Sequence, residues 1–236
     1  MVSFFGCANY QIGHFRRSVT GIMGLSRSPL SIIGQMGATA KRFSYCLPPI
    51  SSPIKTTFLR FGNDVKGRNL SKVSFLNSID YNYRVNLLDI SISGQRLNLP
   101  TGTFPTGCML DAGCGGSVIE TRAYNEILRV LLQHFQRFNL TRVSGGLGFL
   151  QGELCYRLRR GFRNYPGMTF HFQGANYEIG PENLFRVTSD RFCLALTGSN
   201  DRTILGAFQQ QNVRFIYDNG YQKLFFSKED CSQDGA

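Results

Sequence analysis

Asp111 occupies the position in this chain that is best suited to acid/base chemistry. It ends the apolar run Cys108-Met109-Leu110 and is followed by Ala112-Gly113-Cys114, an arrangement that occurs nowhere else in the sequence. An acidic residue between an apolar strand and a glycine-bearing turn directs a carboxylate out of a sheet. Two close carboxyls share one proton and can act as acid and base together. The sequence therefore predicts half of an acid/base pair; the simpler alternative is a turn aspartate that accepts hydrogen bonds from local backbone amides.

The other reactive side chains suggest no further chemical site. Cys108 and Cys114 could form a reactive or metal-binding pair beside Asp111, but no histidine lies nearby in the sequence. We therefore expect two small, partly buried thiols. The histidines are scattered along the chain and suggest no ligand set: His14, His134 and His171. The sequence predicts no metal site and no cofactor.

Composition narrows the class of protein. The chain has 236 residues, a formal net charge of +11 and 42% hydrophobic residues, which is enough to form one large core or two modest ones. The basic residues form no aromatic-interleaved stripe and no recognition helix, so we expect no nucleic-acid partner; a solvated basic face is the simplest reading, and an acidic polymer would suit the same charge. No segment is long and apolar enough to predict a membrane span.

The cysteines indicate an oxidising compartment. There are seven of them without a C-x-x-C pair, which suits disulfides with one thiol left over better than a zinc ribbon or a redox motif. The first residues, Met1 to Cys7, contain neither a basic region nor an apolar stretch of signal-peptide length. Cysteine usage therefore predicts secretion, although these residues show no signal peptide.

Most of the chain reads as short strands separated by turns, which predicts an all-β barrel or sandwich. Residues 83–92 form a strand pattern that breaks at Ser93-Gly94-Gln95, and residues 213–217 form another that ends at Asp218-Asn219-Gly220. One segment differs. From Thr121, the expected N-cap, apolar residues follow helical spacing and predict one amphipathic helix with a buried stripe: Tyr124, Ile127, Leu128, Leu131, Leu132, Phe135 and Phe138.

Several motifs follow one another in a characteristic order. They are Phe5-Gly6-Cys7, Gly21-Ile22-Met23-Gly24-Leu25, Leu30-Ser31, Phe43-Ser44-Tyr45-Cys46-Leu47, Asp111-Ala112-Gly113, Tyr124, Leu154-Cys155-Tyr156, Cys193-Leu194-Ala195, Ile204-Leu205-Gly206 and Gln209-Gln210-Gln211-Asn212-Val213. In this order the chain resembles plant pepsin-like aspartic proteases of the nepenthesin type, and the resemblance covers essentially its whole length. It implies two β-barrel lobes, each of which contributes one aspartate to a cleft between them.

By its position in the family, the chain is expected to begin late in the N-terminal lobe. Residues 1–57 would be a partial N-terminal lobe with the inter-lobe segment, and residues 58–236 a complete C-terminal lobe with one main helix. The first aspartate turn and the flap that covers the substrate would lie upstream of Met1. The apolar residues left in the partial lobe, such as Val2 to Phe5, are then expected to need a partner or to reduce solubility.

The resemblance also assigns roles around Asp111, which corresponds to the second aspartate of the pair. Ala112 stands where the family has a serine or threonine whose hydroxyl bonds across the lobes, and alanine cannot make that bond. Gly113 keeps the pattern. Cys114 replaces a threonine or serine that supports the aspartate, and a thiol is a weaker donor than a hydroxyl. These two departures indicate relaxed selection on catalysis.

The remaining cysteines and two sequons complete the expected sites. The resemblance implies the disulfides Cys46–Cys231 and Cys155–Cys193 and leaves Cys7 without its usual partner. Free thiols are therefore expected at Cys7, Cys108 and Cys114. Asn69-Leu70-Ser71 and Asn139-Leu140-Thr141 are N-glycosylation sequons, which matter if the chain is secreted.

Three classes of function follow from the resemblance. The first is an aspartic endopeptidase that acts on peptides or proteins when complete, with this chain alone predicted to be inactive. The second is a non-catalytic binding protein or inhibitor, since related plant proteins of this fold include xylanase inhibitors. The third is a homodimer that joins two Asp111 turns. The family and the cysteines predict an extracellular or vacuolar location, with no nucleic acid and no membrane as partner.

Overall fold

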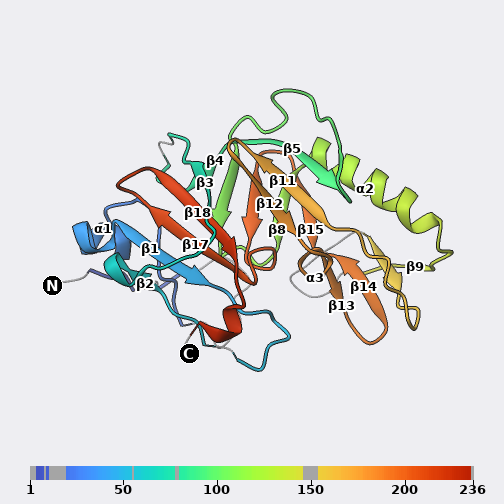
Figure 1. Cartoon of the computed structure of the whole chain (residues 1–236), viewed down its shortest axis with the longest axis horizontal. Coiled ribbons are helices and arrows are strands. Elements are labelled where there is room, and N and C mark those ends of the chain that lie inside the picture. The colour runs from blue at the N-terminus through green and yellow to red at the C-terminus, as the bar shows by residue number, and fades with distance from the viewer. Residues whose placement is uncertain are drawn as a thin grey trace.

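Strands make up most of the regular secondary structure of the described residues, as the sequence predicts (Figure 1). The structure is a computed structural model, and it describes residues 4–7, 9–10, 20–54, 56–77, 80–145 and 154–234. His14 and the first residues of the expected Val2–Phe5 strand lie outside this range; Phe4 and Phe5 lie within it and form no strand. None of the helices in the described part is long and apolar enough to cross a membrane.

Four sheets form the described part of the chain, two of five strands and two of four. The first is antiparallel throughout, in the order β2 (Arg60–Phe61), β1 (Arg42–Cys46), β17 (Val213–Asp218), β18 (Lys223–Lys228) and β3 (Ser71–Ser74). The second mixes parallel and antiparallel pairs, in the order β15 (Leu196–Ser199), β8 (Ser117–Glu120), β16 (Thr203–Gly206), β7 (Cys108–Asp111) and β4 (Arg84–Val85).

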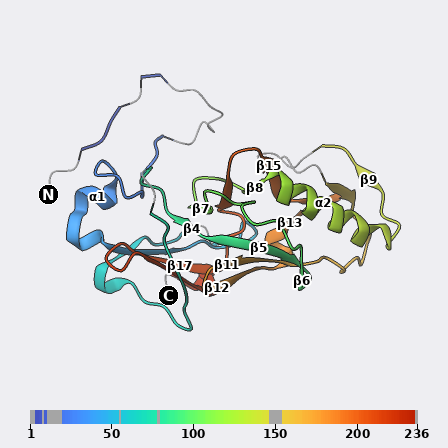
Figure 2. The same ribbon diagram turned by 90° about the horizontal axis from the view of Figure 1, so that it is seen from above.

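The two four-stranded sheets are antiparallel. One runs in the order β12 (Ala175–Ile179), β11 (Met168–Phe172), β5 (Leu87–Ile92) and β6 (Gln95–Arg96). The other runs in the order β13 (Phe185–Val187), β14 (Arg191–Leu194), β10 (Cys155–Arg157) and β9 (Arg142–Val143). The helices are α1 (Ile32–Met36), α2 (Thr121–Gln136) and α3 (Pro181–Leu184), with 3-10 turns η1 (Gly37–Ala40), η2 (Gly62–Asp64) and η3 (Cys231–Gln233). Viewed from above, α1 and α2 lie at opposite ends of the molecule (Figure 2).

Both predicted hairpins are confirmed. β5 turns into β6 through Ser93 and Gly94, whose φ angles are 49° and 81°. Two successive positive φ angles are the signature of a tight turn that matches the twist of the strands it joins. β17 turns into β18 after Asp218, whose Oδ1 accepts a hydrogen bond from Tyr221 N at 3.0 Å.

The predicted helix is confirmed, but its expected N-cap is wrong. Thr121 is the first residue of α2, and Glu120 caps it, because Glu120 Oε2 accepts hydrogen bonds from Arg122 N at 2.8 Å and Ala123 N at 3.3 Å. The Thr121 hydroxyl is already engaged, since it donates to Asn200 Oδ1 at 2.8 Å. The predicted stripe is core: Tyr124, Ile127, Leu131 and Phe135 are buried, and Leu128, Leu132 and Phe138 pack against them half-buried.

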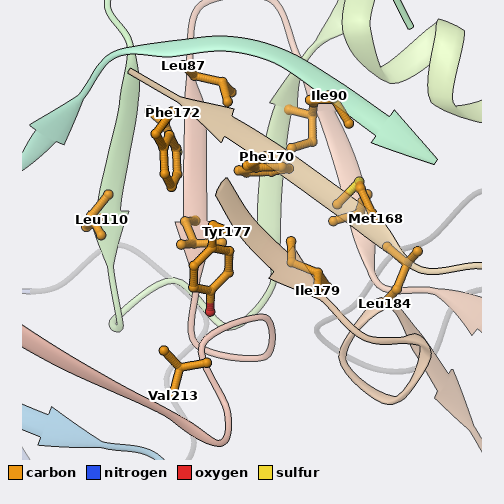
Figure 3. Packing of buried hydrophobic residues seen from close by; sticks show 14 of the residues in the cluster. Leu87, Ile90, Leu110, Met168, Phe170, Phe172, Tyr177, Ile179, Leu184 and Val213 are labelled. Carbon is orange, nitrogen blue, oxygen red and sulfur yellow. The ribbon is translucent and has the colours of Figure 1, made fainter. Parts of the chain in front are cut away.

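A single apolar cluster joins the sheets, and its centre is aromatic. Phe170 and Phe172 of β11 and Tyr177 of β12 pack beneath Leu87 and Ile90 of β5 (Figure 3). The same cluster extends to the rings around Phe135 on α2. Since β1 lies before residue 57 and pairs along its length with β17, the residues on both sides of the predicted division share one sheet. The division into 1–57 and 58–236 stays a prediction.

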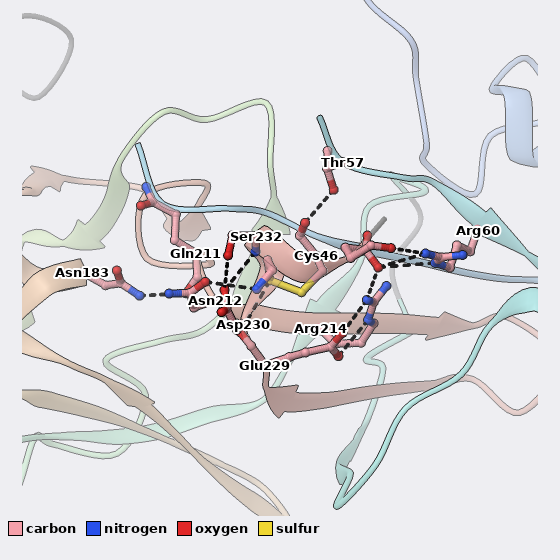
Figure 4. Close-up of a disulfide and its surroundings, with 12 residues drawn as sticks. Cys46, Thr57, Arg60, Asn183, Gln211, Asn212, Arg214, Glu229, Asp230 and Ser232 are labelled. Atoms are coloured by element: carbon pink, nitrogen blue, oxygen red, sulfur yellow. Dashed lines mark hydrogen bonds and ion pairs between the residues drawn. A yellow bond between two sulfur atoms is a disulfide. The ribbon is translucent and has the colours of Figure 1, made fainter. Parts of the chain in front are cut away.

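Two disulfides tie distant segments together. The structure joins Cys46 to Cys231 and Cys155 to Cys193, the pairings that the resemblance implies, at sequence separations of 185 and 38. Figure 4 shows the first bond beside the ion pair of the buried Arg214 with the partly exposed Glu229 (2.6 Å). Closing so long a loop restricts the unfolded chain, so this bond fastens β1 to the C-terminal 3-10 turn and stabilises the fold.

Candidate active site

Asp111 stands at the end of β7, in register with Gly206 at the end of the parallel strand β16. The Asp111 side chain is half-buried, and Gly113 N donates a hydrogen bond to its Oδ1 at 2.8 Å. None of the ion pairs formed within the described residues involves Asp111. The sheet therefore presents a carboxylate that no lysine or arginine of the described chain neutralises.

The turn after Asp111 is anchored to the segment that follows Gly206. Ala207 N donates to Cys114 O at 2.7 Å, and Phe208 N donates to Gly115 O at 3.0 Å. A Cβ on Gly206 would lie 2.5 Å from both C and O of Gly116, closer than real Cβ atoms approach backbone. Glycine at 206 is thus required for the turn to lie against β16, which fixes the backbone that carries Asp111.

Two buried glutamines, Gln209 and Gln210, support the strands next to this turn through side-chain hydrogen bonds. Gln209 is fully buried; its Oε1 accepts from Ser117 N at 2.8 Å, and its Nε2 donates to Asn183 O (2.9 Å) and Ala195 O (3.0 Å). The Ser117 hydroxyl in turn accepts from Gly206 N at 2.9 Å. These bonds satisfy buried backbone groups that would otherwise be unpaired, so the Gln209 side chain links β8 to α3 and to Ala195, which lies between β14 and β15, while the Ser117 hydroxyl links β8 to β16.

The Gln210 side chain connects β16 to β1. Its Nε2 donates to Leu205 O at 2.7 Å, and its Oε1 accepts from the Tyr45 hydroxyl at 2.7 Å. The Tyr45 and Tyr217 hydroxyls lie 2.8 Å apart. Burial raises the pKa of both tyrosines, and the charge of Asp111 adds to the rise. Both hydroxyls therefore stay neutral donors and acceptors beside the carboxylate.

Comparison with known proteins shows the family to which the chain belongs. A model described as "Xylanase inhibitor C-terminal" matches residues 82–228, and one described as "Xylanase inhibitor N-terminal" matches residues 2–63. The chain belongs to the pepsin-like aspartic protease family. An aspartyl protease family protein of Arabidopsis thaliana is 32% identical over 97% of the chain and 49% of its own length. Aspartic proteinase nepenthesin-1 of Nepenthes gracilis is 30% identical over 96% of the chain and 54% of its own length.

The solved structures agree on the fold. Basic 7S globulin from soybean superposes with a TM-score of 0.77 at 18% identity, over 95% of this chain and 63% of the globulin. A structure titled edgp gives a TM-score of 0.74 at 19% identity, over 91% of this chain and 61% of that one. The chain thus spans about half the length of the curated relatives it matches, and it has the all-β pepsin-like fold.

Within the pepsin-like aspartic protease family, the turn after Asp111 in this chain departs from the pattern that the resemblance predicts. Ala112 is exposed and offers a methyl group where the family pattern has a hydroxyl. The Cys114 thiol is half-buried and donates to Gly116 O at 3.0 Å, within its own turn. The turn is anchored through its backbone, and neither Ala112 nor Cys114 supplies the hydroxyl that the family resemblance predicts at its position.

The structure does not gather the other candidate residues into a site. No group of histidine, cysteine, aspartate and glutamate side chains in the described residues could hold a metal ion. His171 is buried between Ser91 Oγ (2.6 Å) and Asn176 Oδ1 (2.8 Å), and His134 lies against Asn164 O at 2.8 Å. Both histidines are satisfied by local partners. The sequons lie in exposed loops, where Asn69 and Asn139 have positive φ angles of 49° and 50°.

The three free thiols differ in environment, and their reactivity is predicted to differ accordingly. Cys7 is exposed, Cys114 half-buried and Cys108 fully buried. Burial raises the pKa of the Cys108 thiol to about 12, so its thiolate is scarce at neutral pH. We expect alkylation of the folded protein at pH 8 to label Cys7 first, Cys114 slowly and Cys108 last, with mass spectrometry as the readout.

Denaturation serves as the control for this thiol prediction. After unfolding without reductant, three thiols are expected to react, because the other four cysteines are in disulfides. A folded protein whose Cys108 reacts as fast as Cys7 would contradict the predicted burial. A count of one thiol would mean that two of the three have paired.

Proposed function

We propose that this chain carries the second-aspartate half of a plant aspartic endopeptidase, with Asp111 as the carboxyl that takes or gives the proton. The observation that carries the proposal is the placement of Asp111: it ends a central strand, its turn is anchored to β16, and no ion pair of the described residues neutralises it. The family membership supports peptide or protein as the substrate class.

We further propose that the chain by itself does not hydrolyse peptides. Hydrolysis by paired aspartates needs one ionised carboxyl to accept a proton from water and one protonated carboxyl to polarise the scissile carbonyl. Among the residues described, the side-chain hydrogen bond of Asp111 comes from Gly113 N, and no hydrogen bond joins its carboxyl to a second carboxyl. Ala112 and Cys114 also remove two supporting hydroxyls from the turn.

A protease assay at acidic pH tests this proposal. The purified chain and the Asp111→Ala variant are incubated with a denatured protein substrate, and the products are analysed by mass spectrometry. We expect no cleavage by the chain that the variant does not also show. Robust cleavage that disappears in Asp111→Ala would overturn the claim that the chain alone is inactive.

A non-catalytic binding or inhibitor function is the second candidate. The observation that favours it is the altered turn at Ala112 and Cys114, together with family models that are described as xylanase inhibitor domains. A scaffold that has lost its chemistry can still present loops to another protein. Inhibition of plant-pathogen xylanases by the same protein, unaffected by Asp111→Ala, would favour this candidate over the endopeptidase.

We also propose a protein partner and a cellular location for the chain. Apolar side chains near the N-terminus are exposed, namely Phe4, Phe5, Tyr10, Ile22, Met23 and Leu30. We propose that a protein surface covers them, because a group of exposed apolar side chains is typical of an interaction surface. The two disulfides and the plant relatives support an extracellular or vacuolar location.

A further inference from the structure

One end of the molecule is unusually rich in arginine. The C-terminal end of α2, the strands β9 and β10 and the loop after β10 meet there, on the side away from both labelled termini (Figure 1). Six arginines belong to this region, which we call the arginine end: Arg137, Arg142, Arg157, Arg159, Arg160 and Arg163. All six are exposed.

The arginine end carries much of the positive charge of the chain. Residues 122–163 contain eight arginines, no lysine and two glutamates, which amounts to more than half of the net charge of +11. One of the two glutamates, Glu126, is already paired with Arg129 at 2.8 Å on α2. The region therefore presents a concentrated positive field rather than a mixture of both signs.

The six arginines of the arginine end form no ion pair among the described residues, whereas many of the other described arginines do. Eight arginines form ion pairs in the described part of the chain: Arg42, Arg60, Arg84, Arg96, Arg129, Arg191, Arg202 and Arg214. None of the six at the arginine end is among them. Like charges held together without counter-charges repel one another, so an anionic partner would relieve this repulsion.

The backbone beneath these arginines is firmly held. Arg159 Nη1 donates to Phe138 O at 2.8 Å, and its guanidinium lies 5.6 Å from the centre of the Phe162 ring. Phe138 and Phe162 pack edge to face at 5.3 Å, which joins the end of α2 to the loop. Arg157 N donates to Thr141 O at 2.8 Å, which joins β10 to the segment before β9. The charged side chains thus project from a fixed scaffold.

The arrangement suits a long flexible polyanion better than a compact ion. Arg142 is in register with Tyr156, the neighbour of Arg157, so Arg142 and Arg157 point to opposite faces of the small sheet. A single small anion cannot reach both faces, whereas a polymer can wrap around the end. Guanidinium forks bond carboxylates in a bidentate way, and this region uses arginine exclusively.

We propose that the arginine end binds an acidic polysaccharide, a chain of sugar carboxylates. The two disulfides favour this polymer over nucleic acid, because disulfide-bonded proteins act mainly in compartments outside the cytosol and nucleus. This surface is separate from the Asp111 turn, and the proposal is independent of any proteolytic activity.

The test measures binding of fluorescently labelled oligogalacturonate by polarisation, with unglycosylated protein so that Asn139 carries no glycan. The disruptive variant is Arg157→Glu with Arg160→Glu and Arg163→Glu; Arg159 is spared because it packs on Phe162. The matched control reverses three exposed cations on and before β3, Lys66→Glu, Arg68→Glu and Lys72→Glu. Both variants change the net charge equally. Circular dichroism and thermal melting check that each variant is folded.

We expect the arginine-end variant to bind at least about tenfold more weakly and the control variant less than about threefold more weakly. Affinity should fall as salt is raised from about 50 to 300 mM, as screening requires. Replacing the three arginines by lysine keeps the charge but should weaken binding, because lysine cannot form the bidentate hydrogen bonds that a guanidinium forms with a carboxylate.

Several results would overturn the proposal. One is equal binding of the fully methyl-esterified oligomer, which has the same sugars without the carboxylates. Another is an equal loss of affinity in the control variant, which would show that the net charge of the protein, and not the position of the arginines, determines the affinity. Tighter binding of duplex DNA of matched charge, or no binding of oligogalacturonate at low salt, would also exclude it.

Discussion

Gly206→Ala is expected to destabilise the protein by about 3 kcal/mol, the largest effect of any single methyl group on this site. The added Cβ would lie 2.5 Å from the backbone of Gly116 and 2.8 Å from Cys114 O. Those atoms belong to the turn that follows Asp111, and backbone cannot move aside as a flexible side chain can. Thermal unfolding should therefore shift downward by about 6–12 °C for a chain of this size.

Gly21→Ala is the matched control for this prediction. A Cβ at Gly21 meets nothing within 4 Å, so its effect on stability should be below about 0.5 kcal/mol. The same variants can be compared by amide hydrogen exchange. In Gly206→Ala we expect faster exchange at Ala207 and Phe208, whose amides bond to Cys114 O and Gly115 O. If Gly206→Ala unfolds at the same temperature as the wild type, the close approach of Gly206 to the backbone of Gly116 would be contradicted.

Local patterns in the sequence were sufficient to predict the elements around the site. The Ser93-Gly94 turn and the apolar stripe of α2 are signals that lie within a few residues, and the structure confirms both. The cap of α2 was missed because Thr121 and Glu120 are both competent acceptors. The choice between them depends on Asn200, which occupies the Thr121 hydroxyl from a distant part of the chain.

The strand pairing and hydrogen bonds that hold the Asp111 turn could not be predicted either, because they join residues that are far apart in the sequence. The parallel pairing of Gly206 with Asp111 joins residues far apart in sequence, and no local pattern specifies it. Gln209 reads as an ordinary polar residue, yet it is fully buried because its partners are backbone groups of Ser117, Asn183 and Ala195. A run of three glutamines after an apolar strand and glycine was the available signal, but only the structure shows which backbone groups it satisfies.

Supplying the other aspartate turn of the pair is expected to give the chain peptidase activity. In this experiment the part of nepenthesin-1 that precedes its match to this chain is fused ahead of Met1, which is expected to supply the aspartate turn that pairs with Asp111. The fusion should cleave protein substrate at acidic pH, because two carboxyls can then share a proton. Asp111→Asn, which keeps the shape of the side chain and removes its acid function, should lower kcat/KM by about 10³-fold.

The same fusion tests the altered turn. Ala112→Thr introduces a hydroxyl at the exposed position where the family pattern places one, and a new hydrogen bond of about 1 kcal/mol across the lobes should raise kcat/KM about fivefold. Ala112→Val is the control, because valine has nearly the shape of threonine without its hydroxyl. If Asp111→Asn leaves the activity of the fusion unchanged, Asp111 is not the acid/base carboxyl. If threonine and valine act alike, the loss of the hydroxyl at 112 does not explain weak catalysis.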